Sequence, residues 1–193
     1  AIESFRKVIY IIAVIAVDND EDEQKALEAL SIAREYILGL SIELQRRSLG
    51  AEEVQRNLEL AAYFTKTKLI PSHRVNALQV AMNQSYKHKN FASASYFASE
   101  FLKIVTSGPR AEQAQKIKAK ADTIARDAIE INFDPYVDFD ICAATYTPIY
   151  KGSPSVSEAL TGAKYQASEK GKLDKITLIT SIGAPASGLR IRV

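Results

Sequence analysis

Residues 76–109 read NALQVAMNQSYKHKNFASASYFASEFLKIVTSGP, and this stretch decides the fold. Apolar residues recur every three or four positions on both sides of the polar break KHKN, which is the periodicity of two one-sided helices. Ala94 and Ala98 allow two helices to approach closely, and the phenylalanines fill the space between neighbouring hairpins. The stretch therefore predicts a helical hairpin. Its apolar positions are Leu78, Ala81, Met82, Tyr86, Phe91, Ala94, Phe97, Ala98, Phe101 and Leu102.

Helical periodicity continues on both sides of this hairpin. We expect helices over about 23–47 and 51–66, and further helices that begin at Pro71 and Pro109, because proline is favoured in the first turn of a helix. The acidic run at 18–22 supplies capping side chains for the helix that follows it.

The first nine residues, AIESFRKVI, carry apolar side chains at Ile2, Phe5, Val8 and Ile9. The spacing A-I-x-x-F-x-x-V-I resembles the second helix of a tetratricopeptide-type hairpin, whose first helix would lie before Ala1. We therefore predict tetratricopeptide-like stacked helical hairpins over residues 1–131.

The composition changes after residue 131, where prolines, tyrosines, threonines and glycines replace alanine-rich segments and the apolar period falls towards two. We expect strands over 140–150, 172–182 and 189–193, which would form a small β-rich C-terminal module over residues 132–193. The predicted fold class is therefore α+β, mainly α, with one domain over 1–131 and a second over 132–193.

Composition narrows the classes of function. The 25 basic and 23 acidic side chains nearly cancel, so no overall charge favours nucleic acid as a partner. The single cysteine excludes an intramolecular disulfide and fits a reducing compartment, which predicts a cytoplasmic protein. The most apolar run, at 8–17, has ten residues, whereas a membrane-spanning helix needs about 20.

Residues that could carry chemistry do not form a recognisable constellation. Cys142 would need a histidine base, and only His73 and His88 exist. The acidic run at 18–23 lacks the glycine of a calcium loop, and the lysines at 116–120 alternate around a helix rather than forming one face. We therefore predict no enzyme activity, no cofactor, no metal and no small-molecule substrate.

Several passages resemble one family closely. They are REYILGLSIELQRR at 34–47, AAYFTKTKLIPSHRVNAL at 61–78, KNFASASYFASEFL at 89–102, FDICAATYTPIYKGSPSVSEALTGAKY at 139–165 and GLRI at 188–191. Together they resemble the C-terminal domain of coatomer alpha subunits over nearly the whole chain, and FDICAATYTPIYKG is the most specific of them.

The resemblance implies a structural part of the COPI vesicle coat, which serves Golgi-to-endoplasmic-reticulum and intra-Golgi transport. It implies binding to the coatomer epsilon subunit, association with other subunits such as beta-prime, and peripheral attachment to Golgi membranes and COPI-coated vesicles through the coat. Some members carry cysteines where this chain has Glu158, Lys164 and Asp174, in a turn like that of a zinc ribbon. With Cys142 as the only thiol, we expect no structural zinc here.

Partner contacts are expected at aromatic side chains, which dominate the energetics of protein interfaces. The candidates are Tyr10, Phe97, Tyr146 and Tyr150. The alternative for each is a place in the hydrophobic core, and for Phe97 the core is favoured. An alternative function is a tetratricopeptide-like adaptor that binds peptide segments of other proteins, and an enzyme built on the β module is a third.

Overall fold

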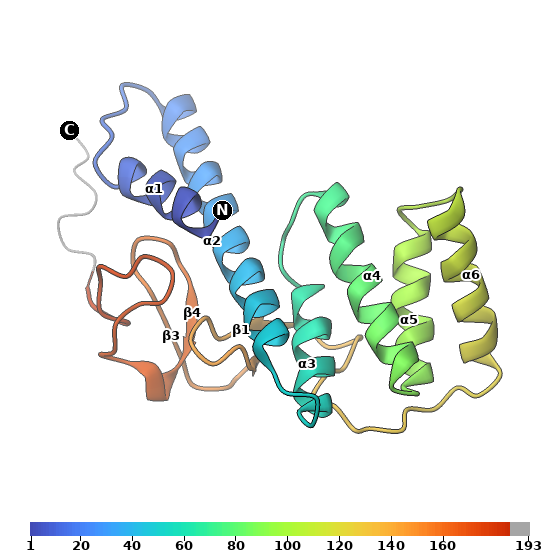
Figure 1. The fold of residues 1–193 in the computed structure, drawn as a ribbon. Coiled ribbons are helices and arrows are strands. Elements are labelled where there is room, and N and C mark those ends of the chain that lie inside the picture. The colour runs from blue at the N-terminus through green and yellow to red at the C-terminus, as the bar shows by residue number, and fades with distance from the viewer. Residues whose placement is uncertain (186–193) are drawn as a thin grey trace. The chain divides into compact units, whose positions relative to one another are not determined.

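The structure is a computed structural model that describes residues 1–185. Its helices and short antiparallel strands confirm the predicted α+β, mainly α class (Figure 1). The predicted strand at 189–193 and the passage GLRI lie outside the described residues. The helices are α1 (Ile2–Ile12), α2 (Asp20–Ser48), α3 (Val54–Phe64), α4 (Pro71–Lys87), α5 (Phe91–Leu102) and α6 (Pro109–Asp122).

The helix boundaries follow from capping chemistry. Asn19 precedes α2, and its side-chain oxygen accepts a hydrogen bond from the backbone N–H of Asp22 at 2.9 Å, so α2 begins three residues before the predicted start. Pro71 and Pro109 occupy the first turns of α4 and α6, as predicted.

The strands differ from the prediction. They are β1 (Phe139–Ile141), β2 (Pro148–Tyr150), β3 (Ser155–Ser157) and β4 (Lys164–Gln166), paired as the two antiparallel hairpins β1–β2 and β3–β4. The strand predicted over 140–150 is a hairpin with a turn at its centre. The strand predicted over 172–182 is wrong, since this segment consists of turns held by one isolated bridge between Leu173 and Ser181. The prediction missed β3 and β4.

The described chain divides into two compact units. The first combines Ala1–Ser41 with the C-terminal part from Val137, and the second is Ile42–Tyr136. Helix α2 belongs to the first unit up to Ser41 and to the second from Ile42. The bounds of these units differ from the domains predicted from composition, 1–131 and 132–193. Which parts fold as separate domains stays a prediction.

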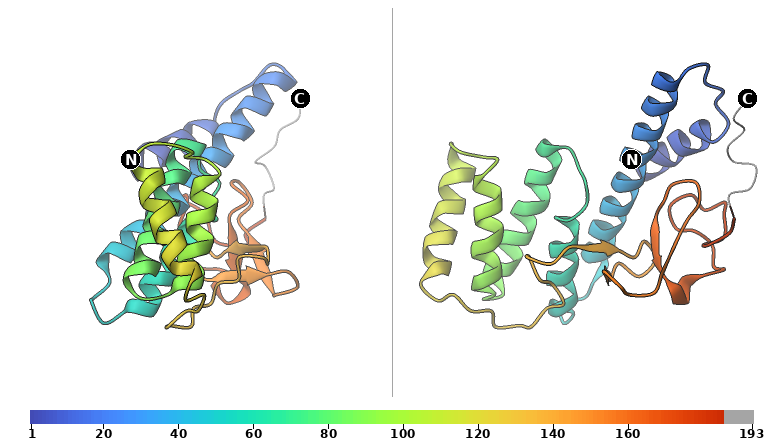
Figure 2. Two further views of the ribbon diagram at one scale, coloured as in Figure 1. Left: turned by 90° about the vertical axis from the view of Figure 1, so that its right-hand side faces the viewer. Right: turned by 180° about the vertical axis from the view of Figure 1, so that it is seen from behind.

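The core of the second unit confirms the hairpin predicted at 76–109. Helix α4 packs against α5, α5 packs against α6, and α3 packs against α4, as Figure 2 shows from two further sides. Phe97 and Phe101 are buried between the helices, and Ala94 and Ala98 are fully buried where α5 meets its neighbours. Small side chains at these positions let the helix backbones approach, as the sequence indicated.

An extended segment closes the second unit. We call residues 126–136 the strap, because the chain leaves α6 and returns past the turn between α4 and α5 towards α3 (Figures 1 and 2). The side chain of Asn90 is fully buried, and its amide donates to the carbonyl of Ile129 at 2.8 Å and accepts from the N–H of Ile129 at 2.9 Å. At Ile129 the strap is thus held through its backbone.

The strap in turn caps α5. The N–H of Phe91 donates to the carbonyl of Arg126 at 3.1 Å, and the N–H of Ser93 donates to the carboxylate of Asp127 at 3.0 Å. These are first-turn N–H groups that have no partner within the helix, and a carboxylate also suits the positive end of the helix dipole. Helix α5 and the strap therefore stabilise each other.

Replacing Asn90 with alanine should lower the free energy of unfolding by about 1–3 kcal/mol, because both backbone groups of Ile129 lose their partner. Asp127→Ala should cost about 1 kcal/mol, as for the loss of a helix cap. Urea denaturation measures both values. Glu130→Ala is the matched control, since Glu130 is exposed in the same segment; equal losses in all three variants would contradict the role given to the Asn90 amide.

Candidate interaction surface

Three of the four predicted contact residues lie in the first unit. Tyr10 is on α1, Tyr146 is in the turn between β1 and β2, and Tyr150 is on β2. Each is half-buried in the described chain. The first unit therefore holds the three predicted contact residues that are not in a core.

Tyr10 is held in place by the loop at 175–177. Its hydroxyl donates to the carbonyl oxygen of Thr177 at 2.6 Å, and Arg6, one helical turn earlier, donates from Nε to the carbonyl oxygen of Ile176 at 3.0 Å. The spacing of four residues puts both side chains on one face of α1. This bonding fixes the ring of Tyr10 before any partner binds.

Tyr146 is held by its backbone and its surroundings. Its φ of 50° lies in the left-handed region, which costs a residue other than glycine about 1 kcal/mol or more. Burial raises the pKa of its hydroxyl above the ordinary value, although a hydrogen bond with Ser41 and the charge of Arg6 act in the opposite direction. Tyr146 is therefore neutral at physiological pH.

Tyr150 and Phe97 differ in accessibility. Tyr150 pairs with Phe139 across the β1–β2 hairpin, with ring centroids 5.5 Å apart in an edge-to-face arrangement. Phe97 is 1% exposed in the core of the second unit and packs against Tyr96 and Phe133. Phe97 therefore lies in the core, which was the alternative favoured for it.

Three turns of the first unit share one design. Each begins with a buried residue, has threonine three positions later and has a residue with left-handed φ four positions later. The three turns are Cys142–Thr145–Tyr146, Glu158–Thr161–Gly162 and Asp174–Thr177–Leu178. In each turn the N–H of the left-handed residue donates to the carbonyl of the first residue, at 2.8, 3.0 and 3.1 Å. Sequence analysis missed this repeat, although the threonine spacing is visible in the sequence.

The carboxylates of Glu158 and Asp174 take part in one hydrogen-bonded cluster. Glu158 accepts from the N–H and the hydroxyl of Thr161, both at 2.7 Å, and Asp174 accepts from those of Thr177 at 2.5 and 2.6 Å. The hydroxyl of Thr180 donates to Glu158 at 3.2 Å and lies 3.2 Å from that of Thr177, so it links the two turns. Threonine thus supplies the donors that a buried carboxylate requires.

Tyr165 completes the carboxylate cluster. Its fully buried hydroxyl donates to Asp174 and accepts from the N–H of Lys175 at 3.1 Å. Burial and the adjoining carboxylate raise its pKa well above the ordinary tyrosine value. Lys164, in contrast, is exposed on β4 and donates to Ser157 at 2.9 Å. Within residues 1–185 no group of three or more histidine, cysteine, aspartate or glutamate residues is arranged to hold a metal ion.

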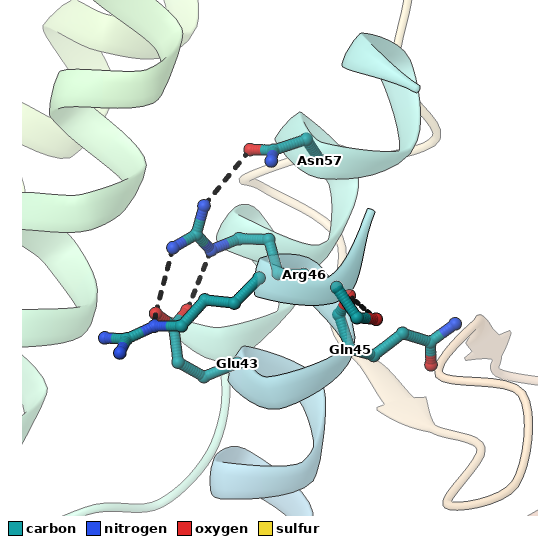
Figure 3. A network of polar contacts seen from close by, with 6 residues as sticks. Glu43, Gln45, Arg46 and Asn57 are labelled. Atoms are coloured by element: carbon teal, nitrogen blue, oxygen red, sulfur yellow. Dashed lines mark hydrogen bonds and ion pairs between the residues drawn. The ribbon is translucent and has the colours of Figure 1, made fainter. Parts of the chain in front are cut away.

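A charged cluster lies in the second unit, where α2 ends and α3 follows (Figure 3). Glu43 is buried and accepts from Arg46 at 2.8 and 2.9 Å and from Arg47 at 2.6 Å, while Arg46 also donates to Asn57 at 3.3 Å. Burial alone would raise the pKa of Glu43, but the hydrogen bonds and charges of the two arginines outweigh burial and lower it. The cluster joins α2 to α3 and leaves the carboxylate ionised.

The remaining candidates for chemistry lie apart along the chain. Cys142 is fully buried in the first unit, and its Sγ accepts from the N–H of Gln166 at 3.4 Å. His73 is exposed at the start of α4, and His88 ends that helix. None of the described helices is long and apolar enough to cross a membrane.

Comparison of the sequence with known proteins places the chain in a family. The family model for the C-terminus of the coatomer (COPI) alpha subunit matches residues 1–193. The chain is 67% identical over 193 residues to "Coatomer subunit alpha" of Saccharomyces cerevisiae. The matched region covers 100% of the chain and 16% of that protein. It is 39% identical over 180 residues to "Putative coatomer subunit alpha" of Schizosaccharomyces pombe, covering 93% of the chain and 15% of that protein.

A third relative is nearly as similar as the second. The chain is 38% identical over 189 residues to "Coatomer subunit alpha-3" of Oryza sativa subsp. japonica, covering 98% of the chain and 15% of that protein. The chain therefore spans only a small part of the length of the relatives that it matches.

The carboxylate cluster should stabilise the first unit without any ligand. Asp174→Ala should lower the free energy of unfolding by about 1–3 kcal/mol, because the N–H of Thr177 and the hydroxyl of Tyr165 lose their buried acceptor. Thermal denaturation followed by circular dichroism measures the change. Asp138→Ala, at an exposed position of the same unit, should stay within about 0.5 kcal/mol of the wild type. If Asp174→Ala matched that control, the cluster would have no structural role.

The Glu43 cluster predicts a dependence of stability on pH. Because the pKa of Glu43 is lower in the folded than in the unfolded chain, its contribution is fully present above the unfolded value of about 4.3 and is lost as pH falls through the folded value. Urea denaturation at neutral pH and at about pH 3 should show a smaller loss for Glu43→Gln than for the wild type. Glu130→Gln, at an exposed carboxylate, should lose as much free energy of unfolding on acidification as the wild type does. If Glu43→Gln also lost as much as the wild type, the proposed contribution of Glu43 would be contradicted.

Proposed function

Because the chain belongs to the family defined by the C-terminus of the coatomer (COPI) alpha subunit, we propose that it is a structural, non-enzymatic part of a vesicle coat and binds the coatomer epsilon subunit. The match over residues 1–193 carries this proposal. The proposed setting is the cytoplasmic face of Golgi membranes, where the chain would be attached through the coat and would meet further subunits such as beta-prime. Transport from the Golgi to the endoplasmic reticulum and within the Golgi would be its context.

The tyrosines of the first unit support a contact with epsilon. Tyr10, Tyr146 and Tyr150 are each half-buried rather than fully buried, and contacts within the unit already hold each side chain. A side chain that is ordered before binding loses little conformational freedom in the complex, which favours it as an anchor. Phe97 is left out of the proposed contact, because it is buried in the other unit.

The strap disfavours the alternative of a peptide-binding adaptor. Helices α3 and α5 of the second unit already bind an extended segment, but that segment belongs to the chain itself. The hydroxyl of Tyr63 donates to the carbonyl of Asn132 at 2.6 Å, and Phe133 packs against Phe97 with ring centroids 5.5 Å apart. A peptide bound in the same way would have to displace these contacts.

Mixing the purified chain with purified epsilon subunit tests the proposal. Size-exclusion chromatography with light scattering should show a stoichiometric heterodimer, and calorimetry should give one class of site. An interface of standard size buries about 1,600 Å² and supports such a complex. Separate elution of the two proteins at concentrations of tens of micromolar would contradict epsilon binding while leaving the family assignment intact.

Tyrosine variants locate the contact. Tyr146→Ala and Tyr150→Ala should each weaken epsilon binding by about tenfold or more, because truncating an interface anchor costs more than about 1 kcal/mol. Tyr136→Ala is the control, since Tyr136 is 88% exposed in the second unit. Unchanged affinity of both β-module variants removes that module from the proposed interface.

A further inference from the structure

Basic side chains gather at one end of the second unit. The turn between α4 and α5 lies at this end, and so does the C-terminal end of α6 (Figures 1 and 2). The basic residues of these segments include five that are exposed. We call these five the basic patch, and they are Lys87, Lys89, Lys116, Lys120 and Arg126.

Contacts between the elements bring the members of the basic patch together. The ammonium group of Lys120, on α6, lies 5.8 Å from the ring centroid of Tyr86, in the last turn of α4. The two lysines of the α4–α5 turn follow Tyr86 within three positions. The carbonyl oxygen of Arg126 accepts from the N–H of Phe91 at 3.1 Å, so the strap begins beside the same turn. The basic patch therefore combines three segments that are separate in the sequence.

The basic patch is not used to hold the unit together. Within residues 1–185 none of its five members pairs with a carboxylate, whereas Lys118, between two of them on α6, pairs with Asp122 at 2.6 Å. The helix ends are capped without these side chains, because carbonyl groups such as those of Tyr86 and Ala121 accept from backbone N–H groups. The cations of the basic patch are therefore available to a partner.

Carboxylates beside the basic patch narrow the class of partner. Asp122, Asp127 and Glu130 are exposed and lie among its members in the sequence. A membrane or a nucleic acid is a broad anionic surface, which would meet these carboxylates together with the cations. The nearly balanced charges of the whole chain provide no long-range field to attract such a polyanion. A short acidic segment, in contrast, can contact the cations alone.

We propose that the basic patch binds an extended segment of a partner protein that is rich in aspartate or glutamate. The carboxylates of this segment would pair with the ammonium groups of the lysines and with the guanidinium group of Arg126, which can hold a carboxylate through two N–H groups. Recognition of acidic motifs by clusters of basic side chains is a recurring mode of peptide binding. The proposal does not depend on binding of the epsilon subunit.

Peptides of defined charge test the proposal. The probe is a fluorescent peptide of about 12 residues, up to about 40 Å long when extended, in which glutamate alternates with serine. A matched peptide carries glutamine in place of glutamate. Anisotropy should show that the chain binds the glutamate peptide, more weakly as NaCl rises from about 0.05 to about 0.5 M, and does not bind the glutamine peptide. A glutamate peptide that stays unbound at low salt overturns the proposal.

Charge-matched variants locate the binding. Replacing Lys89, Lys120 and Arg126 together with glutamine should weaken binding of the glutamate peptide by about fivefold or more, because exposed ion pairs contribute modestly and several are lost. The strap keeps its backbone contact with α5, since the carbonyl oxygen of residue 126 is unchanged. Circular dichroism verifies that each variant is folded. The control removes the same charge from exposed positions of the first unit, as Lys7→Gln, Lys151→Gln and Lys170→Gln in one chain, and should bind as the wild type does.

Two other results would contradict the proposal. Equal weakening in the patch variant and the control would show that only the net charge of the chain matters. Vesicles that contain phosphatidylserine and a single strand of oligouridylate serve as competitors of the glutamate peptide. If either competitor bound the basic patch more tightly for each anionic group than the peptide does, a membrane or a nucleic acid would be the ligand instead.

Discussion

In residues 1–185 every fully buried polar side-chain atom has a hydrogen-bond partner, and both units depend on that constraint. A buried donor or acceptor without a partner costs about 1–3 kcal/mol, which is a large part of the stability of a small domain. In the second unit Asn90 meets the constraint by binding the backbone of the strap. In the first unit Glu158 and Asp174 meet it through threonines of their own turns.

The same constraint explains why these groups are not arranged for catalysis. A catalytic acid or base needs access to a substrate, and its proton has to move during the reaction. The carboxylates of Glu158 and Asp174 are instead buried acceptors with several donors each, and that of Glu43 is kept ionised by two arginines. What the described chain offers to other molecules is surface, where tyrosines and basic side chains lie on elements that are already ordered. That is consistent with the proposed role as a structural part of a coat.

The helices could be predicted from the sequence, because an apolar residue every three or four positions leaves one face to bury, and Pro71 and Pro109 mark where two of them begin. The segment 172–182 could not be predicted in this way: its threonines and aliphatic residues suit a strand, but Asp174 binds them into a turn. The strap was missed because its pairing joins Asn90 to Ile129, which are far apart in the sequence. Tyr10, Tyr146 and Tyr150 were chosen by residue type, and only the structure shows how their rings are held.

The central claim is that this chain acts by presenting ordered surface to other coat proteins. Hydrogen–deuterium exchange of the chain, alone and saturated with epsilon subunit, tests it most directly. The account predicts slower exchange over β1 and β2, with the buried helices α4 and α5 unchanged. Identical exchange in the two samples, or slowing confined to the core of the second unit, would contradict it.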